Sequence, residues 1–115
     1  MDTTPTVTEN DRAHRFEVRV GDELAGYTVY QPPRQGGGYA FVHTEVDPRF
    51  EGRGLATILV GQALDSMRER GATVLPSCPF VRSFIDRRRG YLDLVPEEAR
   101  GRFGLVPTEE PRRDG

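Results

Sequence analysis

The sequence predicts a single α+β domain, and three observations carry that prediction. Three segments before residue 47 alternate apolar and polar residues, as half-buried strands do. Between residues 54 and 70, apolar residues recur at i, i+4 spacing, which indicates a long amphipathic helix. The chain has 115 residues, enough for one modest core and too few for a separate substrate domain. We therefore expect a compact mixed sheet with two helices.

The three expected strands precede a glycine-rich turn. The first covers 16–20, a turn at 21–22 reverses the chain, and the second strand covers 24–30. The loop at 31–38 contains two prolines and three glycines, so it cannot continue the strand. It leads to a third strand at 39–46. These segments predict an antiparallel unit at the N-terminal side of the domain.

The long helix is expected over 54–70. Its buried stripe consists of Leu55, Ala56, Leu59, Val60, Ala63, Leu64 and Met67. Arg68 and Arg70 suit the negative end of the helix dipole, and Gly71 is a natural terminator. The helix should therefore pack one face on the sheet and end at the glycine.

A shorter strand and a second helix are expected next. The strand covers 72–75, and the helix begins near Pro79 with Phe80, Val81, Phe84 and Ile85 on one face. The run 87–89 is three arginines, which is more typical of a solvated helix end than of a nucleic-acid patch. A last strand is expected over 91–95, and a turn or a single helical turn over 96–100.

Both chain ends are expected to be flexible tails. Residues 1–13 and 107–115 are polar and lack apolar periodicity. The domain then covers 14–106.

Composition excludes several partner classes. The formal net charge is −2 with both signs interleaved, so neither nucleic acid nor an anionic membrane is indicated as a partner. No apolar run approaches the roughly 20 residues that span a bilayer, and the N-terminus has no signal-peptide pattern, so we expect a cytoplasmic protein. One cysteine and two distant histidines make a poor metal site, and none is expected. The oligomeric state is not indicated.

The segment Arg49–Ala56 has the layout of an anion cradle. It joins a predicted strand to the long helix, whose first turn offers free backbone N–H groups and the positive end of the helix dipole. Gly52 and Gly54 lack the side chains that would hold a phosphate away. The alternative is ordinary turn chemistry, since glycines also mark plain loops.

The pattern R-x-x-G-x-G in this segment, followed by Leu55 and Ala56, resembles the acetyl-CoA pyrophosphate loop of the GNAT acetyltransferase superfamily. The segment Val74–Val81 is similar to the strand, cysteine and short helix of small stand-alone GNAT-like N-acetyltransferase-domain proteins. The resemblance covers about residues 14–95. It implies that acetyl-CoA, or coenzyme A, binds this chain. The implied contacts are Thr44 and Val46 beside the pantetheine arm, and Arg49, Gly52, Arg53, Gly54, Leu55 and Ala56 at the phosphates.

Two residues are candidates for catalysis. His43 lies on the third strand and could take a proton from an amine, although it shares strand parity with Tyr39 and Phe41 and could simply pack against them. Cys78 precedes the second helix, where the helix N-terminus favours a thiolate, although a lone cysteine is often a small buried apolar residue. The resemblance implies that this histidine and cysteine face each other across the acetyl-CoA site.

The resulting hypothesis is an acetyl-CoA-dependent N-acetyltransferase acting on an amine acceptor, with His43 as base and Cys78 as acid toward the CoA sulfur. An acetyl-cysteine intermediate is a less favoured route. Relatives often carry His-Pro-Glu-Tyr after the second helix, whereas residues 89–91 here keep only the tyrosine. The helices that wall the acceptor pocket of larger enzymes are also missing, so the acceptor is not indicated. The alternatives are a non-catalytic acyl-CoA-binding or interaction module, and a structural domain without a ligand.

Overall fold

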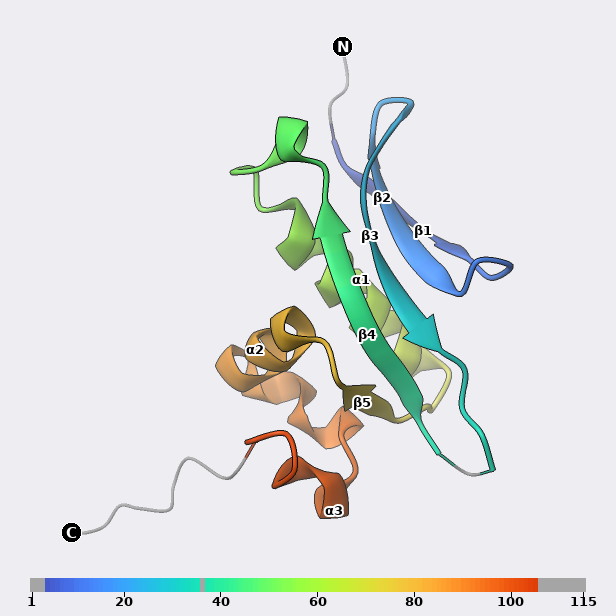
Figure 1. Ribbon diagram of the computed structural model, residues 1–115, viewed down its shortest axis with the longest axis vertical. Coiled ribbons are helices and arrows are strands. Elements are labelled where there is room, and N and C mark those ends of the chain that lie inside the picture. Colours follow the sequence, from blue (N-terminus) through green and yellow to red (C-terminus); the bar gives the residue numbers. More distant parts are fainter. Residues whose placement is uncertain (1–3, 36, 106–115) are drawn as a thin grey trace, which may run out of the picture.

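The computed structural model describes residues 4–35 and 37–105, and it has one five-stranded sheet in the order β1-β2-β3-β4-β5. The strands are β1 (Thr6–Asn10), β2 (Arg15–Val20), β3 (Glu23–Gln31), β4 (Tyr39–Val46) and β5 (Val74–Pro76). The helices are η1 (Pro48–Phe50), α1 (Leu55–Glu69), α2 (Pro79–Arg87), η2 (Arg89–Leu94) and α3 (Glu97–Arg100), where η marks a 3-10 helix. In Figure 1, α1 lies behind the sheet and α2 lies beside β4 and β5. The expected α+β fold is confirmed.

The sheet opens between its last two strands. β1 to β4 are antiparallel, whereas β5 runs parallel to β4 and pairs only with Tyr39–Phe41. After this point the backbone N–H of Cys78 donates to the carbonyl oxygen of Phe41 at 2.7 Å, and α2 begins. Residues 42–46 of β4 have no strand on that side within the described part of the chain. We call these residues the open edge of β4.

The core lies between the sheet and α1. Strands β2, β3 and β4 contribute Phe16, Val18, Tyr30 and Phe41, and α1 contributes Leu55, Leu59, Val60, Ala63, Leu64 and Met67. The predicted stripe of α1 is therefore buried, except that Ala56 is half-buried. Gly71, with φ of +66°, follows the helix as predicted.

The N-terminal tail expected over 1–13 is wrong for Thr6–Asn10, which form strand β1. β1 pairs with β2 along its whole length, and Val7 packs against the core. Glu9 fixes the strand, because it accepts hydrogen bonds from Tyr30 at 2.5 Å and from Arg70 at 2.6 Å. A strand with one apolar residue gives almost no hydrophobic alternation, so its pairing and its carboxylate decide the structure. The tail expected over 107–115 lies outside the described residues.

The strand expected over 91–95 is also wrong, because Arg89–Leu94 form the 3-10 helix η2. Side chains of α1 hold this segment away from the sheet. Arg68 pairs with Asp93 at 2.6 Å and donates to the carbonyl of Gly90 at 2.8 Å. Tyr91 donates to Asp65 at 2.8 Å. These contacts form only when the segment folds against the helix, and a local apolar pattern does not encode them.

The remaining elements fall close to their predicted places. β5 begins two residues later than expected, and α2 begins at Pro79 as expected. The single helical turn after residue 96 is α3. Among the helices of the described residues, none combines the length and apolarity that crossing a bilayer requires.

Candidate functional site

The glycine segment forms a cradle between β4 and α1. Gly52 has φ of +86° and Gly54 has φ of +73°, a backbone region that favours glycine. A Cβ atom built on either glycine would meet no other atom within 4 Å, so the space beside both is open. The sequence-based expectation that the two glycines leave room for a ligand agrees with this geometry.

Backbone donors of α1 face this cradle. Gly54 is the N-cap residue and no side chain caps the helix. The first hydrogen bond of the helix joins Ile58 N to Gly54 O at 3.2 Å, which leaves the N–H groups of residues 55–57 without a helical partner. These N–H groups and the helix dipole favour an anion at this position.

A cavity of about 250 Å³ lies in front of these donors. Gly52, Gly54, Ala56 and Thr57 line it, together with the larger apolar residues Val46, Phe50, Leu55 and Phe80. Glu51 is the one carboxylate among its lining residues. The cavity therefore brings together five of the eight residues predicted to contact coenzyme A: Val46, Gly52, Gly54, Leu55 and Ala56. We call it the glycine cradle.

The two arginines predicted for the phosphates differ in their surroundings. Arg49 lies 3.3 Å from Glu23 and 3.3 Å from Asp47, so two carboxylates already neutralise it. Arg53 has no ion pair within the described residues, and its guanidinium lies 5.2 Å from the centroid of the Phe50 ring. Arg53 is thus the arginine whose charge is available beside the glycine cradle.

His43 lies on the outer face of the sheet, opposite to α1. A bulge in β4 causes this, because Val29 pairs with His43 and Tyr30 with Phe41, which leaves Val42 as an extra residue. The alternation is shifted there, so the possibility that His43 packs against Tyr39 and Phe41 is wrong. The His43 side chain is 57% exposed, and its Nε2 lies 3.0 Å from Glu45 Oε1.

Glu45 joins His43 to a tyrosine on β3. The hydroxyl of Tyr27 donates to the same carboxylate oxygen at 3.3 Å. The hydrogen bond from His43, helped by the one from Tyr27, lowers the pKa of Glu45 below its usual range. The carboxylate thus holds one nitrogen of the imidazole and leaves the other free.

Cys78 lies on the inner face, at the N-cap of α2. It is 3% exposed, and its thiol donates to Thr44 Oγ1 at 3.4 Å. Thr44 Oγ1 lies 2.8 Å from Thr28 Oγ1, and Thr28 is fully buried. Thr44, predicted to contact the pantetheine arm, therefore connects Cys78 to β3 within the open edge.

The structure does not bring His43 and Cys78 into contact. Because His43 and Thr44 are consecutive strand residues, their side chains point to opposite faces, and Cys78 lies with Thr44. The two candidates therefore lie on the two sides of β4, next to its open edge. Sequence reasoning missed Thr28 and Phe80 as neighbours of the site, and it missed the contact between the Glu45 side chain and His43. Only Phe80 gave a signal, an apolar residue beside the helix N-terminus, and it was assigned to the buried face.

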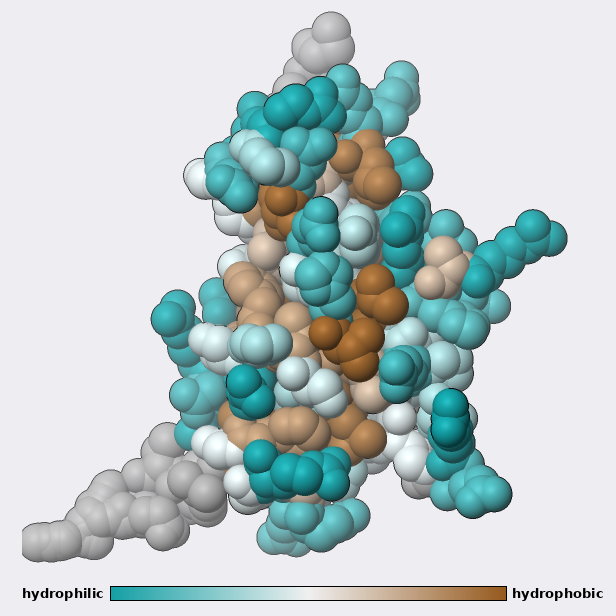
Figure 2. Space-filling view, viewed as in Figure 1, coloured by the Kyte–Doolittle hydropathy of each residue, from teal (hydrophilic) through white to brown (hydrophobic). Residues whose placement is uncertain are grey.

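No helix of residues 4–35 and 37–105 covers the outer face of the sheet. Figure 2 shows this face, with hydrophobic side chains over the middle of β4 framed by hydrophilic ones. Val29, which pairs with His43, is half-buried there. A molecule approaching His43 would therefore meet an open surface.

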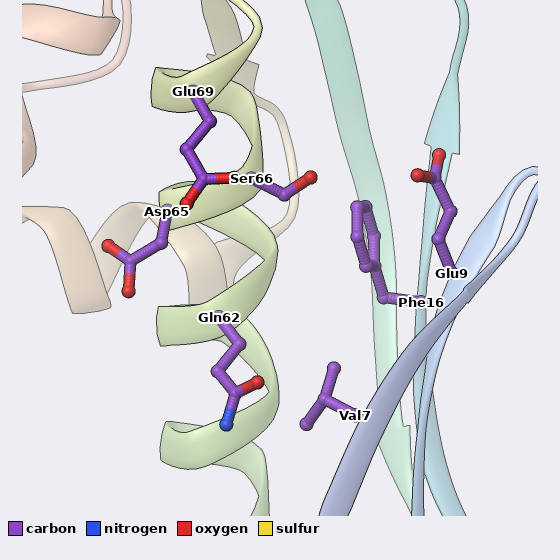
Figure 3. A pocket seen from close by; sticks show the side chains of 7 residues that line it. All are labelled: Val7, Glu9, Phe16, Gln62, Asp65, Ser66 and Glu69. Carbon is purple, nitrogen blue, oxygen red and sulfur yellow. The ribbon is translucent and has the colours of Figure 1, made fainter.

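A larger concavity of about 580 Å³ lies between β1, β2 and α1 (Figure 3). Glu9, Asp65 and Glu69 line it, together with Val7, Phe16, Gln62 and Ser66. Three acidic residues and no basic residue line this groove, which disfavours a phosphorylated ligand. We call it the acidic groove, and its size does not make it the candidate for an anionic cosubstrate.

Comparison with known families decides the classification. Residues 15–94 match the model of the GCN5-related N-acetyl-transferase family, which is well over half of the chain. The chain belongs to this family. The match includes the glycine cradle, the open edge of β4, His43 and Cys78.

The ribosomal-protein-alanine N-acetyltransferase from Brucella melitensis biovar Abortus 2308 is among the solved structures to which this chain is similar. The two share 26% identity with a TM-score of 0.45, and the match covers 76% of this chain. It covers 66% of the Brucella chain, just under two thirds of its length. No curated protein matches the sequence.

Proposed function

We propose that this protein is an acetyl-CoA-dependent N-acetyltransferase that moves an acetyl group to an amine. The observation that carries the proposal is the junction of the glycine cradle with the open edge of β4. The cradle supplies backbone donors for a pyrophosphate, and the edge supplies strand backbone for an amide-containing arm. Both belong to one continuous segment, residues 42–57.

The cradle would hold the pyrophosphate through the N–H groups of residues 55–57. Gly52 and Gly54 would allow close backbone approach, and Arg53 would add charge. Arg49 would have to leave Glu23 and Asp47 to take part, so we assign it a smaller contribution.

The pantetheine arm would lie along the open edge of β4. Its amides resemble a peptide, so they would pair with the backbone at Thr44 and Val46 as an added strand does. The thioester would then reach the point where β5 separates from β4, between His43 and Cys78.

The proposed transfer uses the two candidates from opposite sides. His43 would take the proton of an ammonium group through its free ring nitrogen, while Glu45 holds the other nitrogen. The neutral amine would attack the thioester carbon, so that a C–N bond forms, the C–S bond breaks, and the nitrogen releases its extra proton to solvent. Cys78 would give its proton to the leaving sulfur and recover one from solvent, and His43 would release to solvent the proton it took from the ammonium group.

The burial of Cys78 favours one alternative, a non-catalytic acyl-CoA-binding module. A thiol that is 3% exposed and bonded to Thr44 can be a packing residue. Replacement of Cys78 by alanine separates the two functions. We expect turnover to fall about 10- to 1,000-fold if the thiol protonates the leaving sulfur, and to stay within twofold of wild type if it only packs.

The test of the proposed function has two measurements on the whole chain. Thermal unfolding with millimolar coenzyme A should show stabilisation, because a ligand that binds only the native state raises the free energy of unfolding. Mass spectrometry after incubation with acetyl-CoA and a panel of amines should detect acetylated amine above the uncatalysed rate. Stabilisation without transfer to any amine would favour the binding module, and no stabilisation would contradict the assignment of acetyl-CoA.

A further inference from the structure

A second, smaller concavity continues the glycine cradle along α2. It has a volume of about 110 Å³ and is lined by Thr57, Phe80, Ser83, Phe84, Arg87 and Arg88. Thr57 and Phe80 also line the cradle, so the two cavities share a wall. We call this concavity the arginine trough. It leads from the phosphate-binding end of α1 toward the C-terminal end of α2.

The trough ends at two arginines that have no acidic partner. Within the described residues, neither Arg87 nor Arg88 forms an ion pair, and the guanidinium of Arg88 lies 4.4 Å from the centroid of the Phe84 ring. The next arginine differs, because Arg89 pairs with Asp86 at 2.6 Å. Glu51, which lines the cradle, is the one carboxylate that lines either cavity. The far end of the trough therefore carries uncompensated positive charge.

Phe80 stands between the cradle and these arginines. It is 39% exposed, the one large hydrophobic side chain that is exposed among the described residues. Phe80, Ser83, Phe84 and Arg87 follow the helical spacing that places them on one face of α2. An exposed aromatic ring beside a phosphate site can stack with a nucleobase.

We propose that the arginine trough binds the 3′-phosphoadenosine part of coenzyme A, and this rests on the proposed function. In coenzyme A a single ribose joins the pyrophosphate to both the adenine base and the 3′-phosphate. With the pyrophosphate in the glycine cradle, the adenine stacks on Phe80 and the 3′-phosphate binds Arg87 and Arg88. The protein thus distinguishes coenzyme A from 3′-dephospho-coenzyme A, which lacks the second anionic group.

The test measures the Kd of both compounds by isothermal titration calorimetry with the full chain. Wild type should bind coenzyme A about 10- to 100-fold more tightly than 3′-dephospho-coenzyme A, the range expected for hydrogen bonds to a charged group. The double variant Arg87→Gln/Arg88→Gln should lose this preference by binding coenzyme A more weakly, with its affinity for the dephospho compound nearly unchanged. The matched control is Arg82→Gln/Arg89→Gln, which removes the same charge from the α2 segment without touching the trough. This control should keep the preference.

The stacking role of Phe80 has a separate measurement. Phe80→Ala should weaken both coenzyme A compounds by a similar factor, about 5- to 100-fold. It should leave 4′-phosphopantetheine, which has no adenosine, bound as in wild type. An equal loss for 4′-phosphopantetheine would overturn the stacking role, because Phe80 would then act only by shaping the cradle.

The two proposals fail in different ways. Equal binding of coenzyme A and its dephospho form by wild type would overturn the phosphate-binding role of the trough, while coenzyme A binding itself would still support the proposed function. Loss of the preference in the Arg82→Gln/Arg89→Gln control would overturn it as well, because the effect would then come from net charge. Failure of wild type to bind either compound would overturn both proposals.

Discussion

The two ends of α1 differ in a way that separates a ligand site from a structural contact. At the N-terminal end, the glycine cradle has free backbone N–H groups and a volume of about 250 Å³. Beside the C-terminal half, the acidic groove has about 580 Å³ and three carboxylates. The larger concavity is thus the one whose charges disfavour phosphate. Backbone donors and the sign of the charge identify a site for an anionic cosubstrate, and volume does not.

The carboxylates of the groove also have structural partners. Glu9 binds Tyr30 and Arg70, and Asp65 binds Tyr91. Two of the three groups therefore hold β1 and η2 in place. The cradle, in contrast, leaves its donors without protein partners, as a binding site must.

The largest expected effect is on turnover when the open edge of β4 is altered. His43→Ala should lower amine acetylation about 100- to 10,000-fold, the usual contribution of a general base. Steady-state rates of amine acetylation measure this loss. Glu69→Gln, in the acidic groove, is the control and should leave the rate within twofold. An equal loss of turnover in His43→Ala and Glu69→Gln would contradict the view that only the N-terminal end of α1 belongs to the active site.

Filling the glycine cradle should remove cosubstrate binding. Gly54→Val places a side chain in the open space and should abolish the stabilisation by coenzyme A, which is about 2.7 kcal/mol at a hundredfold excess over Kd. Thermal unfolding with and without coenzyme A measures it.

Gly21→Val controls for backbone strain in this experiment. Gly21 has φ of +61° and open space around it, but it lies in the β2–β3 turn and does not line the cradle. Both variants should lose stability through left-handed backbone strain, about 1 to 2 kcal/mol. Only Gly21→Val should keep the response to coenzyme A.

At the groove, the expected effect is on stability alone. Glu9→Gln removes the charge that receives hydrogen bonds from Arg70 and Tyr30, and should lower the free energy of unfolding by about 1 to 2 kcal/mol. Urea unfolding measures this loss. Glu69→Gln should change stability by less than about 0.5 kcal/mol, because it is exposed and has no partner in the described residues. A loss of coenzyme A binding in Glu9→Gln would show that the groove contributes to the site.

The smallest effect is the pH dependence that Glu9 and Glu17 give to stability. Burial opposes the ionisation of both carboxylates, but hydrogen bonds to them outweigh this effect. Glu9 accepts hydrogen bonds from Arg70 and Tyr30, and Glu17 accepts them from Asn10 and Arg15. The pKa of each carboxylate therefore lies below its usual range. A lowered folded-state pKa contributes stability above the unfolded value of about 4.3. This stability is lost as the pH falls through the folded-state pKa. Urea midpoints between pH 7 and pH 3 should fall less steeply in Glu9→Gln/Glu17→Gln than in wild type.

The structure could be predicted from the sequence where a local pattern of residues determines it. The α1 stripe, the strand at 39–46 and the glycine turn between them all follow from short-range spacing. It could not be predicted where contacts between side chains far apart in the sequence determine the local structure. β1 depends on Glu9 meeting Arg70, 61 residues away, and η2 depends on Arg68 meeting Asp93, 25 residues away. Of the candidate site, the glycine turn before α1 lies where it was expected, whereas the face of His43 was not predicted, because one bulged residue changes the parity of β4.

The bulge at Val42 makes the register of β4 a determinant of chemistry. Phe41 faces the core and His43 faces solvent only because Val42 is an extra residue between their partners on β3. If Val42 instead took a regular place in the ladder, the parity beyond it would shift, so the imidazole would turn toward α1 and Thr44 would turn away from Cys78. One unpaired backbone residue, rather than side-chain identity, is therefore what keeps the histidine and the thiol on opposite sides of the strand. Alignments of this segment would have to place that residue correctly before any residue beyond it is compared.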